Sequence, residues 1–273
     1  MTTTLRPTEP LQRAGDGTLS RRFRVCVNSR PVGELRLCTH PTFPSVAQIH
    51  DLRIDEPDRR RGRGTVAALA AEEVARGWGC GQIETTVPAD AEGALRLATA
   101  LGYVHRNRGM VKPLDDTPPE LPAGSRSRPM TETEYGPWRE RGEAGYIHDW
   151  TSRGVPEAEA VAKARADYAR LMPDGLATGG MVLSVLEHEG TRVGALWLSV
   201  AGETAFVCDV ETDEAVRGRG HGRTLMLLAE RQSVAAGRRV LGLNVFAGNA
   251  PAERLYDSLG YLPVSHTMYK PLL

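Results

Sequence analysis

A glycine-rich turn in the C-terminal part of the chain has the residue types that hold a phosphate group. It runs Arg217-Gly218-Arg219-Gly220-His221-Gly222. Alternating glycines let backbone N–H groups converge on one point without Cβ atoms in the way. A helix that begins at such a turn offers unpaired N–H groups and the positive end of its dipole, which attract an anion. The sequence therefore predicts a phosphate cradle, to which Arg217 and Arg219 add positive charge.

The elements on either side of the turn must hold it in place. Val207–Thr212 predicts a strand that enters the turn, and Arg223–Glu230 predicts a helix that leaves it. Two common phosphate loops do not fit this segment. A Walker A loop requires a lysine that is missing here, and Arg223 breaks the spacing of a dinucleotide-binding turn.

A second motif lies downstream, and the two motifs together resemble the GCN5-related N-acetyltransferases (GNAT). The turn is similar to the acetyl-CoA loop of that family, Arg/Gln-x-x-Gly-x-Gly/Ala. Asn249–Tyr261 is similar to its second signature, Asn-x-x-Ala-x-x-x-Tyr-x-x-x-Gly-Phe/Tyr. The resemblance implies an α/β (α+β) fold with a mixed, mostly antiparallel sheet flanked by helices. It also implies a splayed strand pair at the acetyl-CoA site.

The resemblance further implies roles for single residues. Tyr256 would be the general acid that gives a proton to the departing thiolate, although packing alone would also explain a tyrosine there. Asn249 would bond the pantetheine arm or cap the next helix. The residues implied to bind acetyl-CoA in this half of the chain are Val210, Thr212, Arg217, Gly218, Arg219, Gly220, His221, Gly222, Arg223, Asn249 and Tyr256.

The general base is not evident from the motifs. Relatives place Glu or His at positions that correspond here to Phe206, Cys208 and Asn244, none of which is a usable base. Asp209 and Glu211 lie on the same strand, but strict alternation turns their side chains to the other face. Asp209 has a counterpart in the first half of the chain, which favours a structural role. Glu211 has none and is the candidate catalytic residue, unless a water relay or an acceptor with a low amine pKa serves instead.

The first half of the chain repeats the second. A shift of 158 residues places Asp51 on Asp209 and Gly102 on Gly260, with no gap over about 55 residues. A repeat of this length indicates a duplicated domain. We therefore expect two tandem GNAT domains, at 1–114 and 127–273, joined by a linker at 115–126 with linker composition.

The start of the chain predicts less order. The first ~20 residues are polar, contain proline and glycine, and are expected to be loose. Arg22–Ser29 and Val32–Cys38 alternate like the two strands of a hairpin, with the turn at Asn28–Pro31.

The first copy keeps the glycine loop but lacks the counterparts of Tyr256 and Asn249. Ala98 stands at the position of Tyr256, and Ala91 at that of Asn249. His50 occupies a position where some relatives have a catalytic histidine, but a lone histidine on a strand is more often packed or hydrogen-bonded. We therefore expect a degenerate domain. Its residues implied to bind the cofactor are Leu52, Ile54, Arg59, Gly62, Arg63 and Gly64.

Two amphipathic helices precede the sheet of the second copy, at 131–153 and 156–171. Thr131 begins a capping box, and Pro156 suits the first turn of the next helix. The resemblance implies that these helices cover the acceptor site. Several of their aromatic residues are spaced as core stripes. Trp150, near the loop between the helices, is the candidate substrate-binding residue.

Composition limits the partners. The formal net charge of zero argues against nucleic acid as the main partner. No apolar run has membrane-spanning length. The four cysteines have no disulfide or metal spacing, so we expect free thiols in the cytoplasm and no bound metal. No feature of the sequence indicates an oligomeric state.

The sequence thus predicts an acetyl-CoA-dependent N-acetyltransferase. The C-terminal domain would transfer the acetyl group to a primary amine of a small molecule. A peptide or protein acceptor is an alternative, and so is a non-catalytic acetyl-CoA-binding sensor or scaffold. The plan resembles that of tandem enzymes of the mycothiol-synthase type, but the carboxylate that those enzymes carry on the strand is missing.

Overall fold

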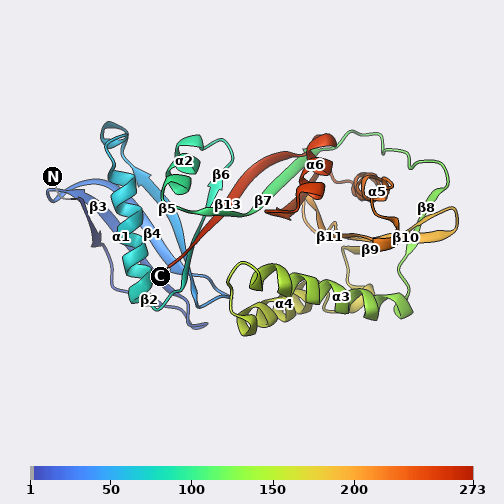
Figure 1. Ribbon diagram of the computed structural model, residues 1–273, viewed down its shortest axis with the longest axis horizontal. Coiled ribbons are helices and arrows are strands. Elements are labelled where there is room, and N and C mark those ends of the chain that lie inside the picture. Colours follow the sequence, from blue (N-terminus) through green and yellow to red (C-terminus); the bar gives the residue numbers. More distant parts are fainter. Residues whose placement is uncertain (1–2, 273) are drawn as a thin grey trace. The chain divides into compact units, whose positions relative to one another are not determined.

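The computed structural model describes residues 3–272 (Figure 1). The chain forms two compact units, and neither is a continuous stretch of sequence. The first unit takes the described residues up to Arg106, Asp149–Lys163, and those from Ser265 onward. The second unit takes Asn107–His148 and Ala164–Val264.

The sheet of the first unit has the order β1-β3-β4-β5-β6-β13, and β2 pairs with β3. Only the β5–β6 pairing is parallel. The elements are β1 (Thr3–Pro7), β2 (Gln12–Arg13), β3 (Leu19–Val27), β4 (Arg30–Thr39), β5 (Val46–Ile54), a short 3-10 helix (Glu56–Asp58), α1 (Arg63–Gly77), β6 (Gln82–Pro88), α2 (Glu92–Ala100) and the end of β13 (Leu262–Pro271).

The sheet of the second unit has the order β7-β12-β11-β10-β9-β8. Here only β11–β12 is parallel. The elements are β7 (Val104–Pro113, from Asn107), β8 (Ser125–Pro129), α3 (Glu132–Thr151, as far as His148), α4 (Glu157–Leu171, from Ala164), β9 (Met181–His188), β10 (Thr191–Ser199), β11 (Ala205–Thr212), α5 (His221–Ala235), β12 (Val240–Phe246), α6 (Ala250–Ser258) and 3-10 helices at Gly175–Ala177 and Glu214–Val216. The rest of α3 and α4 belongs to the first unit.

The predicted repeat is confirmed element by element. A shift of 158 residues carries α1 onto α5, β6 onto β12, α2 onto α6 and β7 onto β13, with the same first and last positions. The helices α1 and α5 both follow a glycine in the left-handed region, at φ 72° for Gly62 and φ 88° for Gly220. Matching patterns of apolar residues and glycines therefore produce matching elements in the two copies.

Each unit is completed by the last strand of the other copy. In the first unit β13 pairs with β6, and in the second unit β7 pairs with β12. A buried ion pair accompanies each strand: Lys270 Nζ lies 2.8 Å from Glu72, and Lys112 Nζ lies 2.8 Å from Glu230. These four positions are also related by the shift of 158. The predicted boundary at 114 follows the repeat, whereas the compact units exchange strands across it.

The two faces of the second unit's sheet carry separate cores. One cluster joins α5, α6 and β12, through residues such as Leu225, Tyr256 and Leu243. The other joins α3 and α4 to the opposite face, through Trp138, Tyr168 and Trp197. Figure 1 shows α5 and the α3–α4 pair on opposite sides of β9–β11. No helix among residues 3–272 is long and apolar enough to cross a membrane.

The N-terminal prediction was wrong. Thr3–Pro7 forms β1, which pairs with β3 from Thr3↔Val27 to Pro7↔Phe23. An edge strand needs few buried side chains, and Leu5, which packs on the core, is sufficient here. The predicted hairpin is confirmed. Its two-residue turn has Asn28 at φ 47° and Ser29 at φ 70°.

The two helices of the second copy are also confirmed. The helix α3 begins after Thr131, whose backbone N–H donates to the Glu134 carboxylate at 2.9 Å. That contact is one half of the predicted capping box. Glu134 also forms an ion pair with Arg128 at 2.7 Å, which fixes the start of α3 to β8.

Candidate active site

The strands β11 and β12 form an open V in the second unit. They pair only from Ala205↔Leu241 to Val207↔Leu243. The rest of β11, through Thr212, is paired to β10 on its other side. Among the described pairings, the β12 side of Val210 and Thr212 therefore has no strand partner, as the splayed arrangement predicted.

The glycine turn closes the wide end of this V. Gly218 and Gly220 have φ of 79° and 88°, a region that side-chain-bearing residues rarely adopt. A Cβ at Gly222 would lie 3.3 Å from Leu255 Cδ2, so glycine also lets α5 approach α6. Arg217 Nε donates to the carbonyl of Thr212 at 3.4 Å, which ties the turn to the strand end. The turn thus combines rigid geometry with free N–H groups.

The turn also carries two exposed arginines, Arg219 and Arg223, and one buried histidine, His221. Arg219 is exposed, and Arg223 donates to Ser258 on α6 at 2.5 Å. His221 is buried, and its ring lies 5.2 Å from that of His188. Burial, with His188 and Arg219 nearby, lowers the pKa of His221, which favours its neutral form. His221 therefore offers the cradle its backbone N–H more readily than a charge.

Helix α6 carries the other two motif residues. Asn249 caps it, since the Asn249 side-chain oxygen accepts from the backbone N–H of Ala252 at 3.2 Å. Tyr256 is 6% exposed, and its ring lies 5.9 Å from that of Tyr261. Burial, together with the nearby charge of Asp209, raises the pKa of Tyr256 to about 12. The phenol therefore keeps its proton at neutral pH, as a proton donor must.

A β-bulge changes which strand residues face the α3–α4 side. Trp197 pairs with Asp209, but the next residue, Leu198, pairs with Val207, so Cys208 is an extra residue in β11. Paired residues on neighbouring strands share a face. Asp209 therefore lies on the face of Trp197, with α3 and α4, and the expectation of strict alternation was wrong at this point.

Asp209 is a strongly perturbed carboxyl group. Burial raises its pKa to about 6, the charge of Glu211 adds to the rise, and the backbone N–H of Val210 opposes it. The charge of Asp209 in turn raises the pKa values of Tyr256 and Tyr168. A carboxyl group with a pKa near neutrality is suited to accept a proton. The bulge hid this residue from the sequence pattern.

Glu211, the candidate named from the sequence, has another partner. Its carboxylate lies 3.2 Å from Arg141 Nε on α3, and Arg141 Nη2 donates to it at 3.4 Å. The contact joins β11 to α3. The ion pair gives Glu211 a positioning role between strand and helix, and its catalytic role stays a prediction.

The loop of the first copy is built in a similar way, with two differences. Arg60, at φ 56°, stands where the second copy has Gly218. Arg59 Nε donates to the carbonyl of Ile54 at 2.8 Å, and Gly62 has φ 72°. Arg63, however, is buried against the carboxylate of Asp58, which also binds Arg30. Because the Arg63 guanidinium is paired with Asp58, Arg63 can offer a phosphate only its backbone N–H.

Comparison with known proteins identifies the family. The sequence model of the Acetyltransferase (GNAT) family matches residues 4–103 and 144–261. The chain belongs to this family. It is an acetyl-transferring acyltransferase with two GNAT copies. Both copies have the splayed strand pair, since β5 and β6 pair only as far as Ile49↔Thr85, and both have a left-handed glycine before the helix.

Individual relatives agree with this assignment. An uncharacterized N-acetyltransferase of Bacillus subtilis, YdgE, is 28% identical over 149 residues, which are 52% of this chain and 95% of YdgE. A mycothiol acetyltransferase of Thermomonospora curvata is 30% identical over 211 residues, 74% of this chain and 66% of that enzyme. A GCN5-related N-acetyltransferase from Sphaerobacter thermophilus has a similar fold, with a TM-score of 0.59 at 18% identity over 92% of this chain and 80% of that one.

Trp150 does not lie in the second unit of this GNAT protein. Its ring is 4.6 Å from that of Phe43, and the Arg106 guanidinium lies 5.0 Å from the ring centre. All three side chains belong to the first unit. The packing supplies a structural reason for this tryptophan, and its role in acceptor binding stays a prediction.

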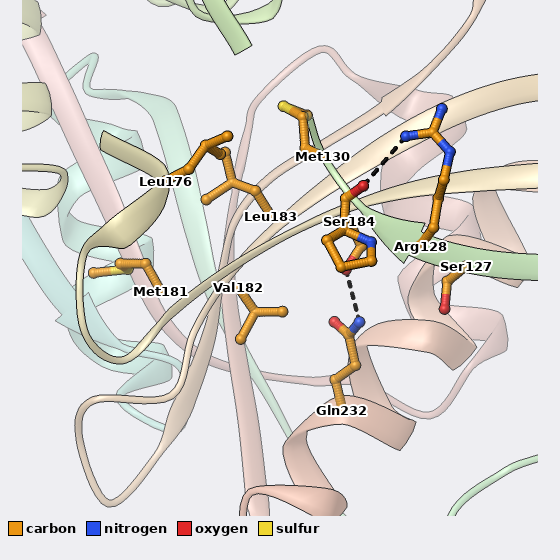
Figure 2. Close-up of a pocket in the computed structure, with 10 residues that line it drawn as sticks. Ser127, Arg128, Met130, Leu176, Met181, Val182, Leu183, Ser184 and Gln232 are labelled. Carbon is orange, nitrogen blue, oxygen red and sulfur yellow. Dashed lines mark hydrogen bonds between the residues drawn. The ribbon is translucent and has the colours of Figure 1, made fainter. Parts of the chain in front are cut away.

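A separate hollow lies at the β8–β9 edge of the second unit (Figure 2). Its volume is ≈ 290 Å³, and its walls include Arg128, Met130, Leu183 and Gln232. Arg128 is already bound to Glu134 and Glu187, and Gln232 donates to Ser184 at 2.7 Å. Because β10 separates this edge from β11 in the sheet, the hollow is not part of the V. Residues 3–272 contain no cluster of His, Cys, Asp and Glu that could hold a metal ion.

Proposed function

We propose that the second copy transfers an acetyl group from acetyl-CoA to the primary amine of a small molecule. The observation that carries the proposal is the closeness of Tyr256 to Asp209, whose charge helps burial to raise the pKa of the phenol. Tyr256 comes from α6, and Asp209 comes from the bulge in β11 on the α3–α4 side. Few parts beyond a donor, an acceptor and a cradle are needed for acetyl transfer.

The residues that would hold acetyl-CoA are those of the turn and the strand edge. The N–H groups from Gly218 to Gly222 suit the diphosphate, because the left-handed glycines have no Cβ atoms to obstruct it. The lack of a Cβ at Gly222 also lets α5 lie close to α6, which positions the turn. Arg217 and Arg219 are exposed beside it. Val210 and Thr212 present backbone groups toward the open V, where the amides of the pantetheine arm can bond.

Asp209 and Tyr256 then move one proton each. The amine nitrogen forms a bond to the thioester carbon, the carbon–sulfur bond breaks, and the amine loses a proton to the Asp209 carboxylate. Tyr256 gives its proton to the departing thiolate, which leaves as free thiol. Protons and charge balance, because the proton on Asp209 can return to the phenolate directly or through water.

The acceptor would approach from the α3–α4 face. Tyr168 lies under α3 there, because a Cβ at Gly142 would come within 2.6 Å of its hydroxyl oxygen. Trp138 and Trp197 form an edge-to-face pair beside it, with ring centres 5.6 Å apart. These rings are part of the packed core between the sheet and α3, so the acceptor would meet Asp209 at the edge of this aromatic cluster.

An amine panel with acetyl-CoA, followed by release of free thiol, tests the proposal. The panel should include the acceptor of mycothiol acetyltransferase, metabolite amines, and peptides with free N-termini or lysines. We expect thiol release with at least one small primary amine. Acetyl-CoA binding without thiol release in the presence of any amine would contradict the proposal and favour a non-catalytic sensor. Thiol release with peptides alone would show that the acceptor is a peptide or protein and not a small molecule.

A further inference from the structure

An opening in the first unit lies in the V of the first copy. Its volume is ≈ 460 Å³, within the range of small-molecule sites. One wall is the splayed end of β5, from Gln48 to Ile54, and another is β6 from Glu84 to Pro88. The floor is made by the helices, with Gly64 and Ala68 from α1 and Ala94, Leu97 and Ala98 from α2.

The entrance of this cavity has the same construction as the V of the second copy. The strands β5 and β6 pair only from Val46↔Gln82 to Ile49↔Thr85, and β5 then continues as far as Ile54. The glycine turn and the Arg59–Ile54 contact repeat those of the second copy. A Cβ at Gly64 would lie 3.2 Å from the Leu97 side chain, just as a Cβ at Gly222 would lie 3.3 Å from the Leu255 side chain. A phosphorylated pantetheine chain therefore fits both entrances by the same geometry.

The inner end of the cavity differs, because Ala98 replaces a tyrosine. In the second copy the Tyr256 ring fills this position and packs on Tyr261. In the first copy Ala98 and Tyr103 line the opening, together with the apolar side chains of Ile49, Val87 and Leu101. The space that a phenol ring fills in one copy is thus part of an apolar pocket in the other.

The chemistry at the inner end also differs. With Ala98 in place, the first copy has no phenol at the position of Tyr256 to protonate a leaving thiolate. Glu84 is buried, accepts from Gln48 at 2.7 Å and faces the buried Arg106 guanidinium at 3.2 Å. A carboxylate that is neutralised by arginine is a poor base. The pocket has the means to bind a thioester and lacks the phenol that α6 supplies in the second copy.

We propose that the first copy is a binding site for a CoA thioester with an acyl group longer than acetyl, held without being transferred. The acyl chain would occupy the space beside Ala98, against Leu97, Leu101 and Val87. This site is separate from the proposed acetyl transfer in the second copy. A thioester bound here would stabilise the first unit by mass action and so report the supply of acyl-CoA.

Calorimetric titration of the full chain with hexanoyl-CoA, acetyl-CoA and free CoA tests this proposal. Each additional buried methylene strengthens binding several-fold, so we expect hexanoyl-CoA to bind one site per chain at least about tenfold tighter than free CoA. Ala98→Tyr restores the ring found in the second copy and should remove that gain. Ala98→Leu adds a smaller side chain and should remove only part of the gain in affinity. It serves as a second test in case Ala98→Tyr does not fold.

Two controls separate this site from the proposed catalytic one. Gly62→Val should abolish the tight hexanoyl-CoA site, whereas Gly220→Val should leave it in place. The proposal is overturned if hexanoyl-CoA binds no tighter than free CoA, or if Ala98→Tyr and Ala98→Leu both bind it like the unaltered chain. Hexanoyl transfer to amines that survives in Gly220→Val would overturn the statement that the acyl group is not transferred. None of these readouts depends on acetyl transfer by the second copy.

Discussion

Removing Lys112 should destabilise the second unit although this residue comes from the other copy of the repeat. Lys112 Nζ lies 2.8 Å from Glu230, whose side chain is 6% exposed, and Tyr261 Oη donates to the same carboxylate oxygen at 3.3 Å. The substitution Lys112→Met keeps the length of the side chain and removes its charge. Glu230 would then be a buried carboxylate with only the tyrosine as partner.

The size of the effect follows from the surroundings of the pair. Breaking a fully buried pair costs about 3–5 kcal/mol of unfolding free energy. The Lys112 side chain is 24% exposed and Tyr261 stays in place, so we expect about 2–3 kcal/mol. Lys270→Met should cost a similar amount in the first unit, where it leaves Glu72 without its lysine.

Urea unfolding followed by tryptophan fluorescence measures this loss. Arg96→Met is the matched control, because Arg96 pairs with Glu92 on the surface of α2 and both side chains are about three-quarters exposed. That substitution should cost less than about 0.5 kcal/mol. The double substitution Lys112→Met with Glu230→Gln should recover part of the stability. A Lys112→Met variant no less stable than Arg96→Met would refute the account of strand exchange fixed by buried charge.

The remaining predictions concern the second copy. Tyr256→Phe should keep acetyl-CoA affinity and lower turnover by roughly 10²-fold, because only the phenol is lost; turnover at the original level would remove Tyr256 from the mechanism. The rate constant kcat/KM should rise with pH through about 6, where Asp209 loses its proton, and Asp209→Asn should abolish that rise. Folding raises the pKa of Asp209 from 3.8, so its ionised form opposes folding above about pH 6. Asp209→Asn should therefore be more stable than the unaltered chain at pH 8 by up to about 3 kcal/mol, with the gain vanishing near pH 4. A difference in urea midpoint between the two proteins that is the same at pH 8 and pH 4 would contradict this.

Much of the fold could be predicted because both copies carry the same local signals. Glycine at Gly62 and Gly220 marks the start of a helix, and Gly102 and Gly260 mark the end of another, so each copy supports the interpretation of the other. The pattern could not reveal that β7 and β13 change places. Lys112 and Lys270 are equivalent under the shift of 158, as are Glu72 and Glu230, so the same charges would suit either neighbour. Only the strand pairings β6–β13 and β12–β7 reveal the exchange.

The site was predictable where it depends on backbone geometry and less so where it depends on strand parity. The turn at Gly218–Gly222 and the cap at Asn249 adopt the expected conformations. Asp209 was assigned to the wrong face because one extra residue, Cys208, reverses the alternation in β11. A bulge has no fixed sequence signature, so strict period-two reasoning fails there. The packing of Trp150 on Phe43 was equally invisible, since Trp150 lies more than 100 positions away along the chain.

The proposal that the second copy is the catalytic one is tested most directly by comparing acetyl transfer in two matched glycine variants. Gly220→Val and Gly62→Val place the same β-branched side chain at the same left-handed position of the two loops, φ 88° and φ 72°. Folded Gly220→Val should lose turnover with acetyl-CoA and a responsive amine, and its second copy should also lose affinity for acetyl-CoA. Gly62→Val should keep turnover. Loss of turnover in a well-folded Gly62→Val variant, with normal turnover in Gly220→Val, would contradict the assignment of catalysis to the second copy.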